Sequence, residues 1–339
     1  MRGRGTADDK GAIAVHLETL RQLRSDLPVS VTVLIEGEEE IGSPTLPALL
    51  AEYAGRLEAD VVIALDSLNA DVGSPSVTTS LRGLLNVILT VRTSDRAAHS
   101  GVFGGVVPDA VGALVQVLAS LADSDGDAAI AGLSHGTGAG APPSVDSLRA
   151  ASGLLDGVAV LGTGSLAERL WYRPAVTVTG IGAPEPHGAA NALAPTANAS
   201  ISLRLAPEED PRRALELLLA HVEAHVPWGS HATVDVVSMG RGWRADADAA
   251  TMRAASASLA RAFGRPAAEI GVGGGIPFIA SYLEAFPGAE AVITAIQDPQ
   301  SRAHAADESV SIDALFAATR AQIDLVRTLG RAHSSIRTG

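Results

Sequence analysis

The sequence predicts an α/β protein in which a mostly parallel sheet, flanked by helices, is interrupted by an inserted α+β unit. Short β-branched runs alternate with helical patterns near both ends of the chain, as is typical of parallel sheets covered by helices. Near residue 80 the pattern changes to longer strands with two helices. The 339 residues suffice for two hydrophobic cores, because single domains usually contain about 100–200 residues.

The first part of the chain alternates helices and strands. Apolar residues spaced three and four apart indicate helices with one buried face, and continuous β-branched runs indicate strands buried on both faces. We therefore expect a helix over 11–24, a buried strand over 29–35, a helix over 45–53 and a second buried strand over 61–65.

The middle of the chain has the order strand–helix–strand–strand–helix–strand, which is typical of an open-faced α+β sandwich. We expect its strands over 85–93, 176–179, 199–205 and about 233–237, and its helices over 109–121 and 211–225. The α/β alternation then resumes with a helix over 251–263, a strand over 291–296 and a helix over 312–329. The expected units are a discontinuous catalytic unit, 1–80 and 241–339, and an inserted unit, 81–240.

The composition excludes several classes of function. A formal net charge of −13 argues against a nucleic-acid surface, which needs clustered Lys and Arg. No apolar run is long enough to span a bilayer, and no secretory signal opens the chain, so we expect a cytoplasmic protein without a membrane partner. Cysteine is absent, so any metal must bind to His, Asp and Glu.

Acidic residues follow the predicted strands of the α/β unit, where open parallel sheets bind ligands. Residues 36–40 (EGEEE) and Asp66 each follow a strand, His304 lies in the loop after a third, and Asp8 precedes the first helix. Carboxylates packed this closely repel one another unless a cation neutralises them. Without cysteine, the set suits zinc, with manganese or cobalt as alternatives.

Each of these residues also has a plainer interpretation. Asp8 and Asp9 could merely cap a helix, the acidic run could be a solvated turn, and Asp66 could be a turn former. A lone histidine such as His304 is more often a surface or core residue than a metal ligand. The metal-site hypothesis therefore depends on the position that the four share at one edge of the sheet.

At these residues the sequence resembles a family of dinuclear zinc peptidases. This family includes carnosinase-type dipeptidases, aminoacylases, acetylornithine deacetylases and succinyl-diaminopimelate desuccinylases. The resemblance is carried by residues 3–11 (GRGTADDKG), 36–43 (EGEEEIGS), 98–101 (AHSG) and 274–277 (GGIP), and by His304. The dipeptidase branch is the most similar, through residues 99–105 (HSGVFGG) and the GGIP segment.

The resemblance implies a metallopeptidase of dipeptidase or carboxypeptidase type with two zinc ions per subunit. Asp8 would bridge the two metals, Glu40 and His304 would complete one site, and Asp66 would serve the other. Glu39 would be the general base in the cleavage of a dipeptide or an N-acyl amino acid. The peptide bond that follows Asp8 is expected to be cis.

The inserted unit resembles the lid of this family, which also forms the homodimer. The resemblance implies that His99 reaches the partner subunit's site and steadies the oxyanion. Asn191, Arg204, Gly274 and Gly275 match positions that contact the substrate. Without the resemblance, His99 would be a loop histidine and Arg204 a surface charge at the edge of a strand.

The sequence departs from the family pattern at two places. The family carries a His-x-Asp segment upstream of residues 3–11, so we expect this part of the catalytic unit to lie outside the chain, with only one zinc bound tightly. Related dipeptidases often carry Arg and Ser at the positions of Gly271 and Gly275, which weakens the case for recognition of a free substrate carboxylate.

Three alternatives remain from the sequence. The chain could be a deacylase or desuccinylase of the same family, or an impaired homologue that serves as a binding protein. Residues 271–275 (GVGGG) could also form a nucleotide-binding loop. However, Ile276 occupies the place of the third glycine of that motif, and no acidic ribose partner is evident.

Overall fold

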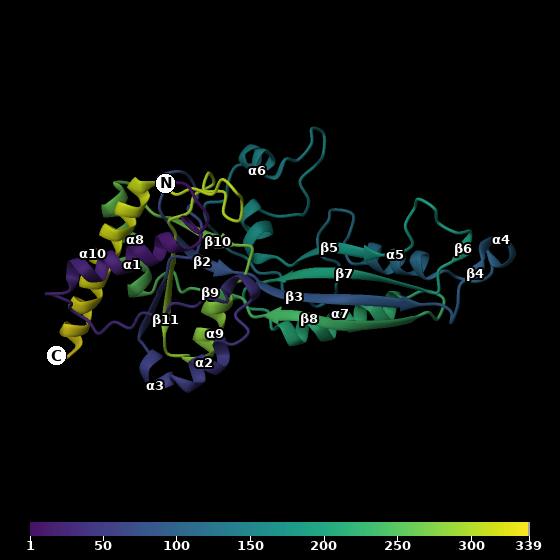
Figure 1. Ribbon diagram of the computed structural model, residues 1–339, viewed down its shortest axis with the longest axis horizontal. Helices are drawn as coiled ribbons and strands as arrows, with labels where there is room; N and C mark the ends of the chain where they lie inside the picture. The colour runs from purple at the N-terminus through teal and green to yellow at the C-terminus, as the bar shows by residue number, and fades with distance from the viewer. Residues whose placement is uncertain (338–339) are drawn as a thin grey trace.

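The computed structural model describes the backbone of residues 1–337 and the side chains of residues 1–331. Figure 1 shows a five-stranded sheet with its helices at one end and a four-stranded sheet that extends away from it. The five-stranded sheet contains β1 (Val61–Ala64), β2 (Ser76–Leu81), β9 (Trp243–Arg244), β10 (Ala268–Val272) and β11 (Glu290–Thr294). The four-stranded sheet contains β3 (Gly83–Arg92), β5 (Ala175–Gly182), β7 (Thr196–Leu205) and β8 (His231–Gly240).

The five-stranded sheet is mixed, whereas a mostly parallel sheet was expected. Its order is β1-β11-β2-β10, with β9 paired to β2. The pairs β1–β11 and β10–β2 are parallel, but β11–β2 and β2–β9 are antiparallel. The direction of β2 and β9 follows from the connectivity: β2 carries the chain out to the four-stranded sheet and β9 carries it back, so the two run in opposite directions.

Residues 29–35 do not form the buried strand that was expected. They belong to no strand, and Val31, Val33 and Ile35 are 42%, 44% and 60% exposed. β-Branched residues favour extended backbone, but a strand also needs a neighbour to accept and donate its ladder hydrogen bonds. No such ladder reaches this segment within residues 1–337.

Helices cover both faces of the five-stranded sheet (Figure 1). Val292 of β11 packs with the helices α8 and α10, whereas its neighbour Ile293 packs with α9, as expected for side chains that alternate across a strand. The helices of this part are α1 (Lys10–Leu23), α2 (Leu46–Glu52), α3 (Ala54–Leu57), α8 (Ala250–Phe263), α9 (Pro277–Ala285) and α10 (Ile312–Arg337), with a 3₁₀ turn, η1 (Glu39–Ile41).

The four-stranded sheet is antiparallel, in the order β5-β7-β3-β8. Two helices, α5 (Ala110–Ser120) and α7 (Pro211–His225), pack on one face over alternate residues such as Leu85 and Ile201. The same part of the chain contains the short pair β4 (Ala98–His99) and β6 (Ala192–Leu193), the helices α4 (Ser100–Phe103) and α6 (Val145–Ser152), and a π-helical turn, η2 (Glu168–Tyr172).

The two sheets are joined by two chain segments that run side by side. Arg82 links β2 to β3, and residues 241–242 link β8 to β9. A Cβ at Gly242 would lie 2.6 Å from the Pro207 carbonyl oxygen and 2.7 Å from that of Leu81. Only glycine allows the backbones to approach this closely, so the junction is a tight two-stranded ribbon.

Most of the predicted elements are present, including α1, α5, α7, α8, β1 and β11. Several elements were not predicted, among them β2, α6, β10 and α9. Among the helices described, none combines the length and apolar character needed to cross a bilayer.

Candidate metal centre

Three predicted ligands, Asp8, Glu40 and His304, come together at one end of the five-stranded sheet. One ligand atom from each residue lies within 4.8 Å of the other two. His304 Nε2 is 2.9 Å from Asp8 Oδ2 and 3.3 Å from Glu40 Oε2. Asp8 lies just before α1, Glu40 lies in η1 and His304 lies in the loop after β11, so residues about 300 apart in the sequence meet here.

The loop that carries His304 has an unusual backbone. His304 has a φ of 66°, in the left-handed region that few non-glycine residues adopt. Hydrogen bonds close the loop on both sides: Ala305 N donates to Arg302 O at 3.0 Å, and Ser309 N donates to Ser301 O at 2.8 Å. Strained backbone of this kind persists only where the surrounding structure enforces it.

Glu308 holds the Asp8 segment in place, a role that was not predicted from the sequence. Its side chain is fully buried and accepts backbone N–H groups from Gly5, Ala7 and Asp8 at 2.9, 2.8 and 3.0 Å. Burial raises the pKa of this carboxyl, but the three N–H donors outweigh it and lower the pKa below its ordinary value. Glu308 is therefore an ionised anchor for the loop that presents Asp8.

Further carboxylates surround the three ligands and perturb one another. Burial, followed by the charges of Asp8 and Glu40, raises the pKa of Asp66 to about 6. Burial, followed by the charges of Asp66 and Glu40, raises the pKa of Glu39 to about 7. Without a cation, these carboxyl groups do not all ionise readily at the same pH, because each negative charge at a partly buried site disfavours the ionisation of its neighbours.

Asp9 belongs to the same cluster, although the sequence indicated only a helix-capping role for it. Burial, followed by the charge of Asp66, raises the pKa of Asp9 to about 8. Its Oδ1 is buried and has no hydrogen-bond partner in the described part of the chain. The Asp8–Asp9 peptide bond is cis, as predicted. The uncompensated carboxylates and the unpaired oxygen fit a site for divalent cations with oxygen and imidazole ligands.

His99 and Asn191 lie far from this cluster within the chain. His99 ends β4, at the end of the four-stranded sheet remote from the N-terminus and β11 (Figure 1). Its Nδ1 accepts the N–H of Gly101 at 3.0 Å, and Ser100 N donates to Asn191 O at 2.9 Å. Both side chains are exposed.

Arg204, Gly274 and Gly275 lie at the junction of the two sheets. Arg204 is on β7, opposite Leu84 of β3, and the two glycines lie in the loop between β10 and α9. A Cβ at Gly275 would be 3.4 Å from the carbonyl oxygen of Arg82, whereas Gly274 faces open space. Gly275 and Arg204 thus both lie near Arg82, the residue between β2 and β3.

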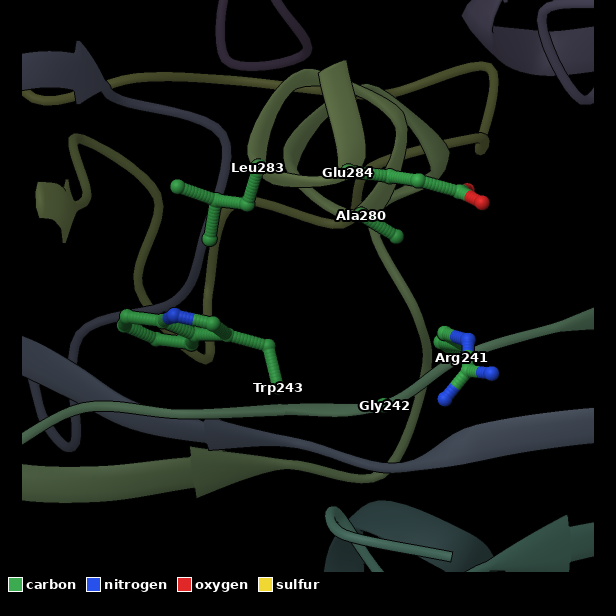
Figure 2. Close-up of a pocket in the computed structure, with 6 residues that line it drawn as sticks. All are labelled: Arg241, Gly242, Trp243, Ala280, Leu283 and Glu284. Carbon is green, nitrogen blue, oxygen red and sulfur yellow. The ribbon is translucent and has the colours of Figure 1, made fainter. Parts of the chain in front are cut away.

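A separate pocket of about 420 Å³ lies between the β8–β9 connection and α9. Figure 2 shows Trp243 and Leu283 facing each other across it, with Arg241 and Glu284 at its other end. None of the predicted site residues lines this pocket, so it is not the metal centre.

Comparison with known proteins gives the family of the chain. The model of peptidase family M20/M25/M40 matches residues 1–328. The cysteinylglycine-S-conjugate dipeptidase of Corynebacterium striatum is 31% identical over 336 residues, which are 97% of this chain and 74% of the relative. Human β-Ala-His dipeptidase is 26% identical over 303 residues, so the match spans 83% of this chain but only 59% of the human protein.

Solved structures show the same fold. The dipeptidase Dug1p of Saccharomyces cerevisiae aligns with a TM-score of 0.79 at 23% identity, over 98% of this chain and 73% of that one. The M20 metallo-carboxypeptidase Sso-CP2 of Sulfolobus solfataricus aligns with a TM-score of 0.80 at 23% identity, over 97% and 77%. The family match over residues 1–328, on a chain with this fold, shows that the protein belongs to peptidase family M20/M25/M40.

Proposed function

We propose that this chain is a metal-dependent hydrolase that cleaves the amide bond of a dipeptide or an N-acyl amino acid. The observation that supports this most is the convergence of Asp8, Glu40 and His304 within 4.8 Å in a member of a peptidase family. The names of its relatives favour dipeptides, because the bacterial and human proteins are both dipeptidases.

The donor set of the cluster fits zinc, with manganese or cobalt as alternatives. In our proposal Asp8, Glu40 and His304 would hold one cation, and Asp8 and Asp66 would hold a second. When bound, such a pair of cations lowers the pKa of a water molecule and polarises the substrate carbonyl. The chain's own residues supply the ligand charge and the proton transfers.

Glu39 is the proposed general base. Glu39 and Glu40 are the first two residues of the η1 turn. Because they are adjacent, Glu40 can serve as a metal ligand while Glu39 serves as the base. Burial, followed by the charges of Asp66 and Glu40, raises its pKa to about 7, and a pKa near neutrality suits a general base. Glu39 takes a proton from the attacking water as the oxygen bonds to the carbonyl carbon. It then delivers that proton to the amine nitrogen as the C–N bond breaks.

We further propose that residues 81–240 form a lid through which two chains dimerise. The lid sheet ends in the edge strands β5 and β8, and such edges are commonly protected by pairing. The apolar side chains of Ile181 and Val237 on these strands are exposed, which favours an interface in which a second chain covers them. In the dimer, His99 and Asn191 at the exposed tip would serve the partner's site, since both are remote from the cluster of their own chain.

Hydrolysis assays test this proposal and separate it from the alternatives. The purified chain, supplied with zinc or manganese, is assayed with a panel of dipeptides and with N-acetyl and N-succinyl amino acids, beside Glu39→Gln. Dipeptide cleavage that requires metal and is lost in Glu39→Gln supports the proposal. Preferential cleavage of N-acyl substrates would favour a deacylase. Dipeptide binding without turnover by a fully metal-loaded chain would favour a binding protein.

A further inference from the structure

The pocket between the β8–β9 connection and α9 combines an apolar wall with two opposite charges. Its volume is about 420 Å³. Figure 2 shows the side chains of Trp243 and Leu283 facing each other at one end, with those of Arg241 and Glu284 at the other. This volume lies at the small end of the range for ligand pockets, about 300–1,000 Å³. The pocket therefore suits a small molecule better than a long peptide.

The pocket opens on the face of the five-stranded sheet that α9 covers. Trp243 pairs with Leu81 of β2, and both belong to the same apolar cluster as Leu283 of α9. Successive side chains of a strand point to opposite faces, so the next residue, Arg244, lies on the other face, with its guanidinium 5.0 Å from the ring centroid of Tyr172. The sheet therefore separates the pocket from the η2 turn, and none of the proposed metal ligands lines it.

The two charges of the pocket do not neutralise each other. Arg241 pairs instead with Asp210, from Nη2 to Oδ2 at 2.6 Å, which leaves further N–H donors of the guanidinium free, since it carries five. Glu284 forms no ion pair with any residue that the structure describes. Opposite charges that line one pocket without meeting leave room for a ligand that carries both an anionic and a cationic group.

The apolar end of the pocket offers a surface for a large hydrophobic group. Trp243 and Leu283 are both only partly buried, so part of their apolar surface is in contact with water. An aromatic ring that enters between them can stack on the indole in an offset or edge-to-face arrangement. Removal of this apolar surface from water favours binding.

We propose that this pocket binds a free α-amino acid with a large apolar side chain. The carboxylate lies beside Arg241, the ammonium group beside Glu284, and the side chain between Trp243 and Leu283. An amino acid carries both charges on one carbon atom, so it can satisfy both residues within one small cavity, whereas a peptide carries them at its two ends. The site is distinct from the metal centre, and its existence does not depend on the proposed hydrolytic function.

The proposed site joins the two units of the chain. Residues 241–243 lead from the four-stranded sheet back into the five-stranded sheet, whereas α9 packs on the five-stranded sheet. Asp210, the partner of Arg241, caps the N-terminus of α7 in the inserted unit. A bound amino acid therefore bridges a segment that comes from the inserted unit and a helix of the catalytic unit.

The test is calorimetric titration of the EDTA-treated chain with L-phenylalanine, for which we expect saturable binding. Phenethylamine lacks the carboxylate and 3-phenylpropionate lacks the ammonium group, so each should bind at least about threefold more weakly, as the loss of an exposed ion pair implies. Glycine lacks the apolar side chain and should bind at least about tenfold more weakly. L-alanyl-L-phenylalanine separates a free amino acid from a peptide, and it should bind more weakly than phenylalanine.

Variants locate the site within the chain. Glu284→Gln should weaken phenylalanine binding at least about threefold, and Trp243→Ala should weaken it at least about tenfold. The matched controls are Glu223→Gln, at an exposed glutamate of α7, and Trp228→Ala, at a tryptophan that is 62% exposed. Both controls should bind phenylalanine as the wild type does, and so should His304→Ala, because the metal centre takes no part in this binding.

Three results would overturn the inference. One is the absence of saturable phenylalanine binding to the wild type at millimolar concentration. Another is binding by Glu284→Gln as tight as that of the wild type; because Glu284 is exposed, this variant decides the matter even if Trp243→Ala does not fold. The third is tighter binding of L-alanyl-L-phenylalanine than of phenylalanine. None of these titrations needs metal or turnover, so their outcome is independent of whether the chain hydrolyses peptides.

Discussion

Replacement of Glu308 by glutamine should loosen the metal centre without touching a metal ligand. Glu308 Oε1 accepts the N–H groups of Ala7 and Asp8, and Oε2 accepts that of Gly5. The amide of glutamine can keep its oxygen toward Ala7 and Asp8, but its NH2 group then faces the N–H of Gly5. One hydrogen bond is lost outright and two lose the charge that strengthens them.

The size of the effect follows from these three bonds. Hydrogen bonds to charged groups contribute roughly 1.5–3 kcal/mol, compared with about 1 kcal/mol for neutral ones. Loss of one such bond and weakening of two should therefore lower the free energy of unfolding by at least about 2.5 kcal/mol. Zinc affinity should fall about 10–100-fold, the usual effect of removing support behind a ligand, because Asp8 is no longer held.

The assays are urea unfolding in EDTA, followed by circular dichroism, and calorimetric zinc titration. Glu290→Gln is the matched control, because Glu290 is exposed at the start of β11.

The pKa of Glu308 is lowered by folding, so its stabilisation is present above the unfolded pKa and is lost as the pH falls through the folded pKa. The difference between wild type and Glu308→Gln should thus narrow below about pH 4. A variant within about 0.5 kcal/mol of wild type at pH 7, with unchanged zinc affinity, would refute the anchoring role.

Three further outcomes are expected. Glu39→Gln should abolish hydrolysis while the metal content, measured by elemental analysis, stays nearly constant; activity within about threefold of wild type would exclude Glu39 as the base. The pKa values of Asp9 and Asp66 are raised to about 8 and about 6, so the folded state without metal binds more protons than the unfolded state. The Tm in EDTA should therefore fall as the pH rises from about 4 to 8, and a rising Tm would contradict this. Light scattering at micromolar concentration should find a dimer, and a monomer would refute assembly through the lid.

The sequence predicted helices and the inserted sheet well, because their periodicity is local. The prediction for residues 211–225 matches α7, in which Pro211 occupies the first turn and Asp210 caps the N-terminus. The prediction was wrong for residues 29–35 and missed β2, for opposite reasons. The first is a β-branched run without a strand beside it, whereas β2 (SVTTSL) is polar in sequence but fully buried between β11 and β10. Pairing decides both cases, and pairing is not local.

The direction of the strands could not be read from periodicity either. Alternation of strands and helices predicted parallel pairs, but β2 and β9 are the outward and return paths to the inserted sheet and so run antiparallel. The convergence of Asp8, Glu40 and His304 was predicted better. His304 does lie in the loop after β11, but no strand precedes Glu40, so its place was indicated by the sequence motif and not by a strand end. The role of Glu308 as an anchor and the place of Asp9 in the carboxylate cluster were not predicted. A buried carboxylate four residues after His304 has no distinctive spacing in the sequence.

Zinc binding at His304 tests the central claim most directly. Wild type, His304→Ala and His231→Ala, the last on the exposed start of β8, are stripped of metal with EDTA, dialysed free of the chelator and titrated with zinc by calorimetry. Wild type and His231→Ala should each hold at least one tightly bound zinc per chain, and His304→Ala should bind it at least tenfold more weakly, since it lacks a direct ligand. Equal zinc affinity in His304→Ala and wild type, or no tight zinc in the wild type, would contradict a metal centre built on Asp8, Glu40 and His304.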